Sequence, residues 1–182
     1  MLKEFGHEIW TAHGPEVSVL GFHYPTRMAV IRLSDGNLFI WSPIQLTDSL
    51  RAEVDAVGRV RHIVAPNSLH HLFLPEWKRA YPGARLYAPP GLRKKRKDVV
   101  FDADLGTAPS PDWGEEIDQV PMRGNLITTE VVFFHYRSGT CRDRFQCLSV
   151  RGFTTQGTRR STSCDEDWRH LGYRDLGASG KL

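Results

Sequence analysis

The sequence predicts an α/β domain followed by a poorly ordered C-terminal tail. Residues 61–65 (RHIVA) form a short β-branched run that Pro66 closes, which is typical of a buried strand ending in a turn. A helix at residues 76–81 and a second apolar run at residues 84–88 follow, so this stretch has the order of a βαβ unit. From residue 137 onward only six of 46 residues are Ala, Val, Ile or Leu, which is too few to build a core.

The N-terminal segment is predicted to form an antiparallel meander. Its strand-like runs are residues 8–11, 17–20, 27–33 and 38–41. The last two runs are joined by Ser-Asp-Gly-Asn at residues 34–37, a sequence typical of a hairpin turn.

A helix is expected to follow the meander. Thr47 is a good cap, and Asp48 places negative charge at the positive end of the helix. Gly58 is a plausible stop. The buried face should carry the apolar residues at helical spacing, Leu50, Val54 and Val57.

The loop after the strand at residues 61–65 is the candidate functional site. Its turn presents His70 and His71 just beyond the carboxyl end of the strand, and Pro75 then stands at the start of the next helix. Ligands of open α/β sheets bind outside the carboxyl ends of strands. We therefore expect any chemistry to lie near residues 67–71.

This arrangement resembles the metallo-β-lactamase superfamily, whose members carry His-x-His-x-Asp-His in the loop after such a strand. The local sequence APNSLHHLFL looks more like an uncharacterised bacterial family of that superfamily than like its hydrolases. The resemblance implies a partial metallo-β-lactamase-like αββα sandwich at residues 8–135. Residues 136–182 would then be a disordered or out-of-frame tail.

The resemblance also bears on a metal site. With the last histidine of the motif on His71, the other ligand positions fall on Pro66, Ser68 and His70, and only His71 is kept in kind. Pro66 and Ser68 cannot bind a metal as imidazoles do. Asn125 stands where superfamily hydrolases often have a further histidine ligand, so a second metal position is changed.

Two function hypotheses follow. In the first, the protein has neither an intact metal site nor hydrolase activity and needs no cofactor. It then holds a small molecule or a protein partner in a cleft lined by Asn67, Ser68 and Asn125, or it has no function left. In the alternative, a metal-dependent hydrolase uses His71, with or without His70, to bind zinc or another divalent metal that activates water. The missing ligands favour the first hypothesis.

Adjacent histidines seldom bind one metal together, because their side chains point in different directions. We expect one imidazole of the pair His70 and His71 to pack under Leu72 and Phe73, with its ring nitrogens bonded to backbone. The other should face the cleft.

Other candidate catalytic residues have structural interpretations. Ser42 follows a strand, but no Gly-x-Ser-x-Gly surrounds it, so a nucleophile is not favoured. Two acidic pairs could serve acid–base chemistry, namely Asp102 with Asp104 and Glu115 with Glu116. They sit at expected strand edges and turns, where carboxylates are common because they face solvent and cap backbone amides.

Composition sets the class of protein. The chain has 182 residues, 40% hydrophobic and 25% charged, which suits a single domain. No apolar run reaches the roughly 18 residues of a membrane span, so a cytoplasmic location and no membrane partner are expected. Residues 136–182 hold nine basic and five acidic residues, which leaves 15 basic and 16 acidic residues elsewhere. The net charge of +3 therefore belongs to the tail.

Residues 93–97 (RKKRK) carry five positive charges. We interpret them as a solvated helix face, with a functional anion patch as the alternative. Interleaved aromatic residues are missing, so nucleic acid is not favoured as a partner.

Strands are also expected at residues 99–102, 117–122 and 130–135, and beyond the last of these the character of the chain changes. A shifted reading frame near Thr140 is favoured over a natural disordered tail. The tail cysteines, which match neither a compact zinc motif nor a complete set of disulfides, are Cys141, Cys147 and Cys164. Loss of the second half of a sandwich would expose apolar faces, so self-association is expected.

Overall fold

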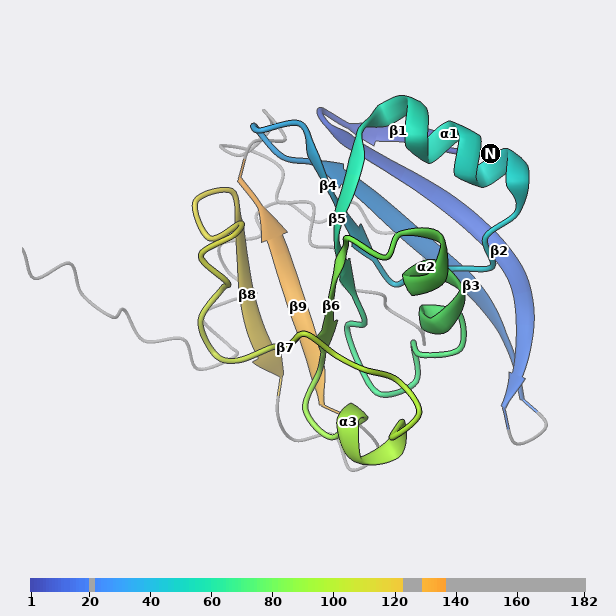
Figure 1. Ribbon diagram of the computed structural model, residues 1–182, viewed down its shortest axis with the longest axis vertical. Coiled ribbons are helices and arrows are strands. Elements are labelled where there is room, and N and C mark those ends of the chain that lie inside the picture. Colours follow the sequence, from blue (N-terminus) through green and yellow to red (C-terminus); the bar gives the residue numbers. More distant parts are fainter. Residues whose placement is uncertain (20–21, 123–128, 137–182) are drawn as a thin grey trace, which may run out of the picture.

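The computed structural model describes residues 1–19, 22–122 and 129–136. In these residues a seven-stranded sheet lies between helices on one face and a two-stranded sheet on the other (Figure 1). The large sheet contains, in spatial order, β1 (Lys3–Gly6), β2 (Ile9–Val19), β3 (Phe22–Arg32), β4 (Asn37–Trp41), β5 (Arg59–Val64), β6 (Arg85–Ala88) and β7 (Ala103–Asp104). The small sheet pairs β8 (Ile117–Met122) with β9 (Glu130–His135), and the helices are α1 (Asp48–Val57), α2 (Leu74–Ala80) and α3 (Leu92–Lys95).

The pairing changes along the large sheet. Strands β1 to β4 form antiparallel pairs, whereas β4, β5, β6 and β7 pair in parallel. The predicted βαβ unit is confirmed as β5, α2 and β6, with Pro75 in the first turn of α2. The carboxyl ends of β4 and β5 consequently lie side by side, at the place where the candidate loop begins.

Helix α1 has the ends that the sequence predicts. The Thr47 hydroxyl accepts a hydrogen bond from the Leu50 amide at 3.2 Å, and the Gly58 amide donates to the Val54 carbonyl at 3.3 Å. Leu50 and Val54 are buried against the sheet. Local capping and an apolar stripe are therefore sufficient to define this helix.

Two strand predictions need correction. Residues 9–11 and 17–19 of the first two predicted runs belong to one long strand, β2, whose register shifts between His13 and Glu16. The strand expected at residues 99–102 was wrong, because β7 begins only at Ala103. Asp102 stands just before it, where its amide donates to the Leu86 carbonyl and its carboxylate accepts from the Leu86 amide.

Each face of the large sheet has its own core. On the helix side, fully buried Trp77 of α2 donates its indole N–H to the Ile44 carbonyl at 2.7 Å. Between the two sheets, Phe39 packs edge to face on Trp113 and Phe133, with ring centroids 5.1 and 5.5 Å apart. Helices, sheet and sheet are thus three of the four layers of an αββα sandwich, which confirms the predicted α/β fold class.

The predictions for residues 137–182, including the three cysteines and the shifted frame, lie outside the described residues. Self-association through apolar faces stays a prediction. Within the described part of the chain, no helix is long and apolar enough to cross a membrane.

Candidate functional site

The candidate loop, residues 66–73, is held by three strands. It follows β5 directly, and the Ser42 amide at the end of β4 donates to the Val64 carbonyl at 2.9 Å. On the other side, the Val131 amide of β9 donates to the Pro66 carbonyl at 2.8 Å. The loop therefore lies where both sheets meet at the carboxyl end of the parallel strands.

Asn67 and Ser68 shape the loop. Asn67 is buried, and its side-chain oxygen accepts from the Leu69 amide at 2.9 Å while its carbonyl accepts from the His70 amide at 3.3 Å. The Ser68 carbonyl accepts from Lys95 Nζ at 3.0 Å. Asn67 thus acts as a turn-forming residue, and Asn125, the third expected cleft residue, lies outside the described residues.

His70 is hydrogen-bonded to Ser42. The Ser42 hydroxyl lies 2.5 Å from His70 Nδ1, and the ring centroid of Trp41 lies 6.2 Å from that of His70. Ser42 is buried and has φ of 54°, a left-handed conformation that is unfavourable for serine. Burial, with a smaller contribution from His71, lowers the pKa of His70 to about 4. The ring is therefore neutral near pH 7.

His71 is hydrogen-bonded to Arg96. Arg96 Nη1 donates to His71 Nδ1 at 2.8 Å and to the His71 carbonyl at 3.0 Å, while the rest of the guanidinium pairs with Asp98. Burial lowers the pKa of His71, and the positive charges of Lys95 and Arg96 lower it further. The ring nitrogens named here bond to side chains, not to backbone as the sequence suggested.

Three residues of the two acidic pairs make structural contacts. Asp102 pairs with Lys78 at 3.1 Å and Asp104 with Arg93 at 2.6 Å. The Glu116 carboxylate accepts from the amide and hydroxyl of Ser34, which ties the segment before β8 to the turn between β3 and β4.

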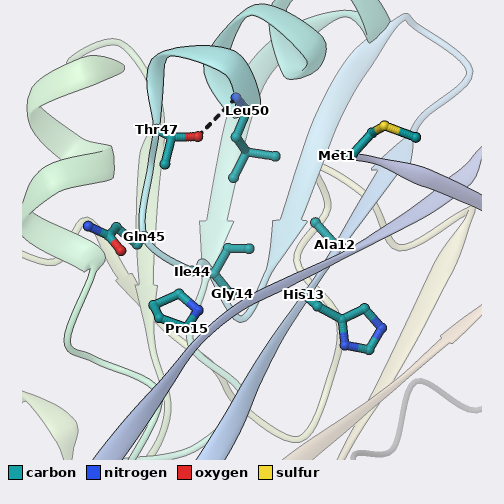
Figure 2. Close-up of a pocket in the computed structure, with 9 residues that line it drawn as sticks. All are labelled: Met1, Ala12, His13, Gly14, Pro15, Ile44, Gln45, Thr47 and Leu50. Atoms are coloured by element: carbon teal, nitrogen blue, oxygen red, sulfur yellow. Dashed lines mark hydrogen bonds between the residues drawn. The ribbon is translucent and has the colours of Figure 1, made fainter.

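Two surface pockets lie away from the loop histidines, His70 and His71. Figure 2 shows one of about 130 Å³ between the register shift of β2 and the start of α1, lined in part by His13, Gly14 and Thr47. A side chain on Gly14 would place its Cβ 2.4 Å from Thr26 Oγ1, so this part of β2 requires glycine. The other pocket, about 260 Å³, lies near the amino ends of β5 and β6 and is lined in part by Gly58 and Tyr81. Neither is lined by His70 or His71.

A second histidine network begins at His62 and Tyr87, buried between the two sheets, and reaches the surface at Asp112. His62 Nδ1 lies 3.2 Å from the Tyr87 hydroxyl, which donates to Asp112 at 2.9 Å. Asp112 also pairs with Arg85. Burial lowers the pKa of His62 to about 4 and is the main cause of a raised pKa at Tyr87. This network fixes the segment before β8 onto the large sheet.

Sequence analysis missed both partners of the loop histidines. Ser42 was found only as an unsupported nucleophile, although its place at the end of a strand beside β5 could have indicated contact with the loop. Arg96 was hidden among five consecutive basic residues, and nothing local distinguishes it from its neighbours.

Solved structures of metallo-β-lactamases share this fold. The DIM-1 metallo-β-lactamase has a TM-score of 0.59 at 18% identity, covering 74% of this chain and 64% of its own. The enzymes from Pontibacter korlensis and Hirschia baltica have TM-scores of 0.56 and 0.55 at 10% and 12% identity, each covering 74% of this chain and 66% of its own. At these identities the likeness concerns the fold alone.

This chain spans just under two thirds of the length of those enzymes. No curated protein matches it. A family described as Domain of unknown function (DUF4336) matches residues 7–141, which is most of the chain and includes the whole histidine loop. The chain therefore belongs to the DUF4336 family and has a metallo-β-lactamase-like fold.

Proposed function

We propose that this protein is a metal-independent binding protein, in which the loop at residues 66–73 is a contact surface for a small molecule or a partner. The hydrogen bond from Arg96 to His71 Nδ1 carries the proposal. A guanidinium has no acceptor and keeps its protons at neutral pH, so it uses the Nδ1 lone pair. The neutral ring then holds its proton on Nε2, and neither nitrogen of His71 offers a free lone pair to a metal.

The remaining donors support the same conclusion. Ser42 is bonded to Nδ1 of His70, and the other two motif positions are Pro66 and Ser68. A catalytic zinc generally takes three protein ligands. Within residues 1–19, 22–122 and 129–136, no three His, Cys, Asp or Glu side chains gather in a way that could hold a metal. The described residues therefore do not fit the metal centre that the fold implies.

Metal content tests the proposal. The purified protein and its His71→Gln variant are incubated with zinc or manganese, dialysed, and analysed by elemental mass spectrometry. We expect both to hold only background metal. One zinc or manganese per chain, bound with sub-micromolar affinity and lost in His71→Gln, would revive the metal-dependent hydrolase with His71 and His70 as ligands.

A matched control separates a built site from adventitious binding. His23 is an exposed histidine on β3, so His23→Gln removes an imidazole without touching the loop. Equal loss of metal in His23→Gln and His71→Gln would indicate surface binding. That result would leave the proposal standing.

A further inference from the structure

Apolar side chains are exposed around the histidine loop. Leu69 and Leu72 are 46% and 48% exposed, and Val100, beyond α3, is 81% exposed. The other large hydrophobic side chains exposed in the described residues lie at the N-terminus, on β1 and β3, or directly after β9. Leu69 and Leu72 stand in the loop at residues 66–73, and Val100 follows α3 (Leu92–Lys95) along the chain. Helix α3 lies at one end of the molecule in Figure 1.

The loop and the segment at residues 92–100 are joined by hydrogen bonds. Lys95 Nζ donates to the Ser68 carbonyl at 3.0 Å, and Arg96 Nη1 donates to the His71 carbonyl at 3.0 Å. The Val99 amide in turn donates to the Arg96 carbonyl at 3.3 Å. These bonds hold Leu69, Leu72 and Val100 on two segments that contact each other. We call this the loop–α3 face.

The loop–α3 face has an excess of positive charge. Arg93 is paired with Asp104 and Arg96 with Asp98. The exposed residues Lys94, Lys95 and Lys97 form no ion pair with a carboxylate in the part of the chain that the structure describes. Lys95 and Arg96 donate hydrogen bonds to loop carbonyls, so their positive charge lies at the loop, where it also lowers the pKa of His71.

We infer that the loop–α3 face docks on an anionic lipid surface. Lysine heads suit lipid headgroups, and aliphatic side chains beside them can enter the boundary with the acyl chains. Protein interfaces, by contrast, are depleted in lysine and enriched in aromatic residues, and single-stranded nucleic acid is bound by stacking on aromatic residues. The three side chains that this face exposes are aliphatic. This inference departs from the expectation that the protein has no membrane partner. A peripheral contact with the membrane surface requires no membrane-spanning helix.

The inference rests on the proposed function only in treating the loop as a contact surface. Sedimentation with vesicles tests it, using phosphatidylcholine alone and phosphatidylcholine with 30% phosphatidylglycerol, at 50 and 500 mM NaCl in the presence of EDTA. We expect binding to the anionic vesicles at low salt that is largely lost at high salt, and little binding to neutral vesicles. If the protein held stoichiometric metal and still bound vesicles in EDTA, the metal-independent proposal would fail and the lipid-docking inference would stand.

Variants localise the contact. Lys94→Gln/Lys97→Gln should weaken partition by about 25-fold, at about fivefold for each lysine. Leu69→Ser/Leu72→Ser should weaken it on the order of tenfold. Lys3→Gln/Arg59→Gln removes the same charge from exposed positions in β1 and at the start of β5, and should change little.

All variants carry exposed substitutions, so unchanged circular dichroism is expected of them. The inference is overturned if wild-type protein fails to sediment with anionic vesicles at 50 mM NaCl, or if the Lys94→Gln/Lys97→Gln variant binds no more weakly than the Lys3→Gln/Arg59→Gln control. Equal binding to neutral vesicles also contradicts it. So does binding of a DNA duplex in place of vesicles.

Discussion

His62 and His71 stand on the same stretch of chain but depend on different kinds of partner. His62 lies inside β5, buried between the sheets beside Tyr87 of β6, and the Tyr87 hydroxyl bonds to the exposed carboxylate of Asp112. His71 lies in the loop that follows, half-buried, with Arg96 as its partner. Burial is the main cause that keeps His62 neutral, whereas at His71 a permanent cation also selects which nitrogen holds the proton. The surroundings of His62 therefore affect the stability of the fold, whereas those of His71 determine which ring nitrogen can accept a bond in the loop.

The largest expected effect is the pH dependence of stability that arises from buried His62. The folded pKa of His62 is about 4, against an ordinary value of 6.5, so the unfolded chain binds more protons between these pH values. The stability that neutral His62 contributes is complete above pH 6.5 and is lost as the pH falls towards 4. The loss should be on the order of 3 kcal/mol.

Phenylalanine at position 62 can keep the ring contact with Trp113 but cannot take a proton. In urea unfolding between pH 7 and 4.5, His62→Phe should therefore reduce the pH slope of the unfolding free energy by up to about 1.4 kcal/mol per pH unit. His70, whose pKa is also lowered by burial, keeps part of the slope in both proteins. Identical slopes would show that His62 is not the titrating group.

A smaller effect is expected where the loop meets β4. Ser42→Ala removes the hydrogen bond to His70 and keeps a side chain at φ of 54°, so it should lower the unfolding free energy by about 1 kcal/mol. Ser42→Gly removes the same bond but tolerates this φ. We expect Ser42→Gly to be more stable than Ser42→Ala by about 1 kcal/mol in urea unfolding. The reverse order would mean that the backbone at Ser42 is not strained.

The smallest effect on stability, and the sharpest test of the loop, concerns the proton of His71. Nitrogen NMR of the ring should show the Nε2–H tautomer in the wild type, because Arg96 donates to Nδ1. Arg96→Met should release this constraint and yield a mixture of tautomers, with little change in unfolding midpoint. A wild-type ring already protonated on Nδ1 would contradict the basis of the metal-independent proposal.

Sequence by itself determined the elements whose signals are local. Thr47, Gly58 and the apolar residues between them define α1, and the prolines around residues 66–75 mark the strand, loop and helix of the βαβ unit. A short continuous apolar run also identified β9. Each of these depends on residues within a few positions of one another, where propensity, capping and alternation of apolar residues act directly.

Only the tertiary structure decided the surroundings of the loop histidines. Ser42 and His70 are 28 residues apart, and His71 and Arg96 are 25 apart. Their contacts exist because β4 and β5 are parallel neighbours and because the segment after β6 returns to the loop. No local preference encodes such a meeting. It is set by the order of strands in the sheet, which depends on burying both faces at once.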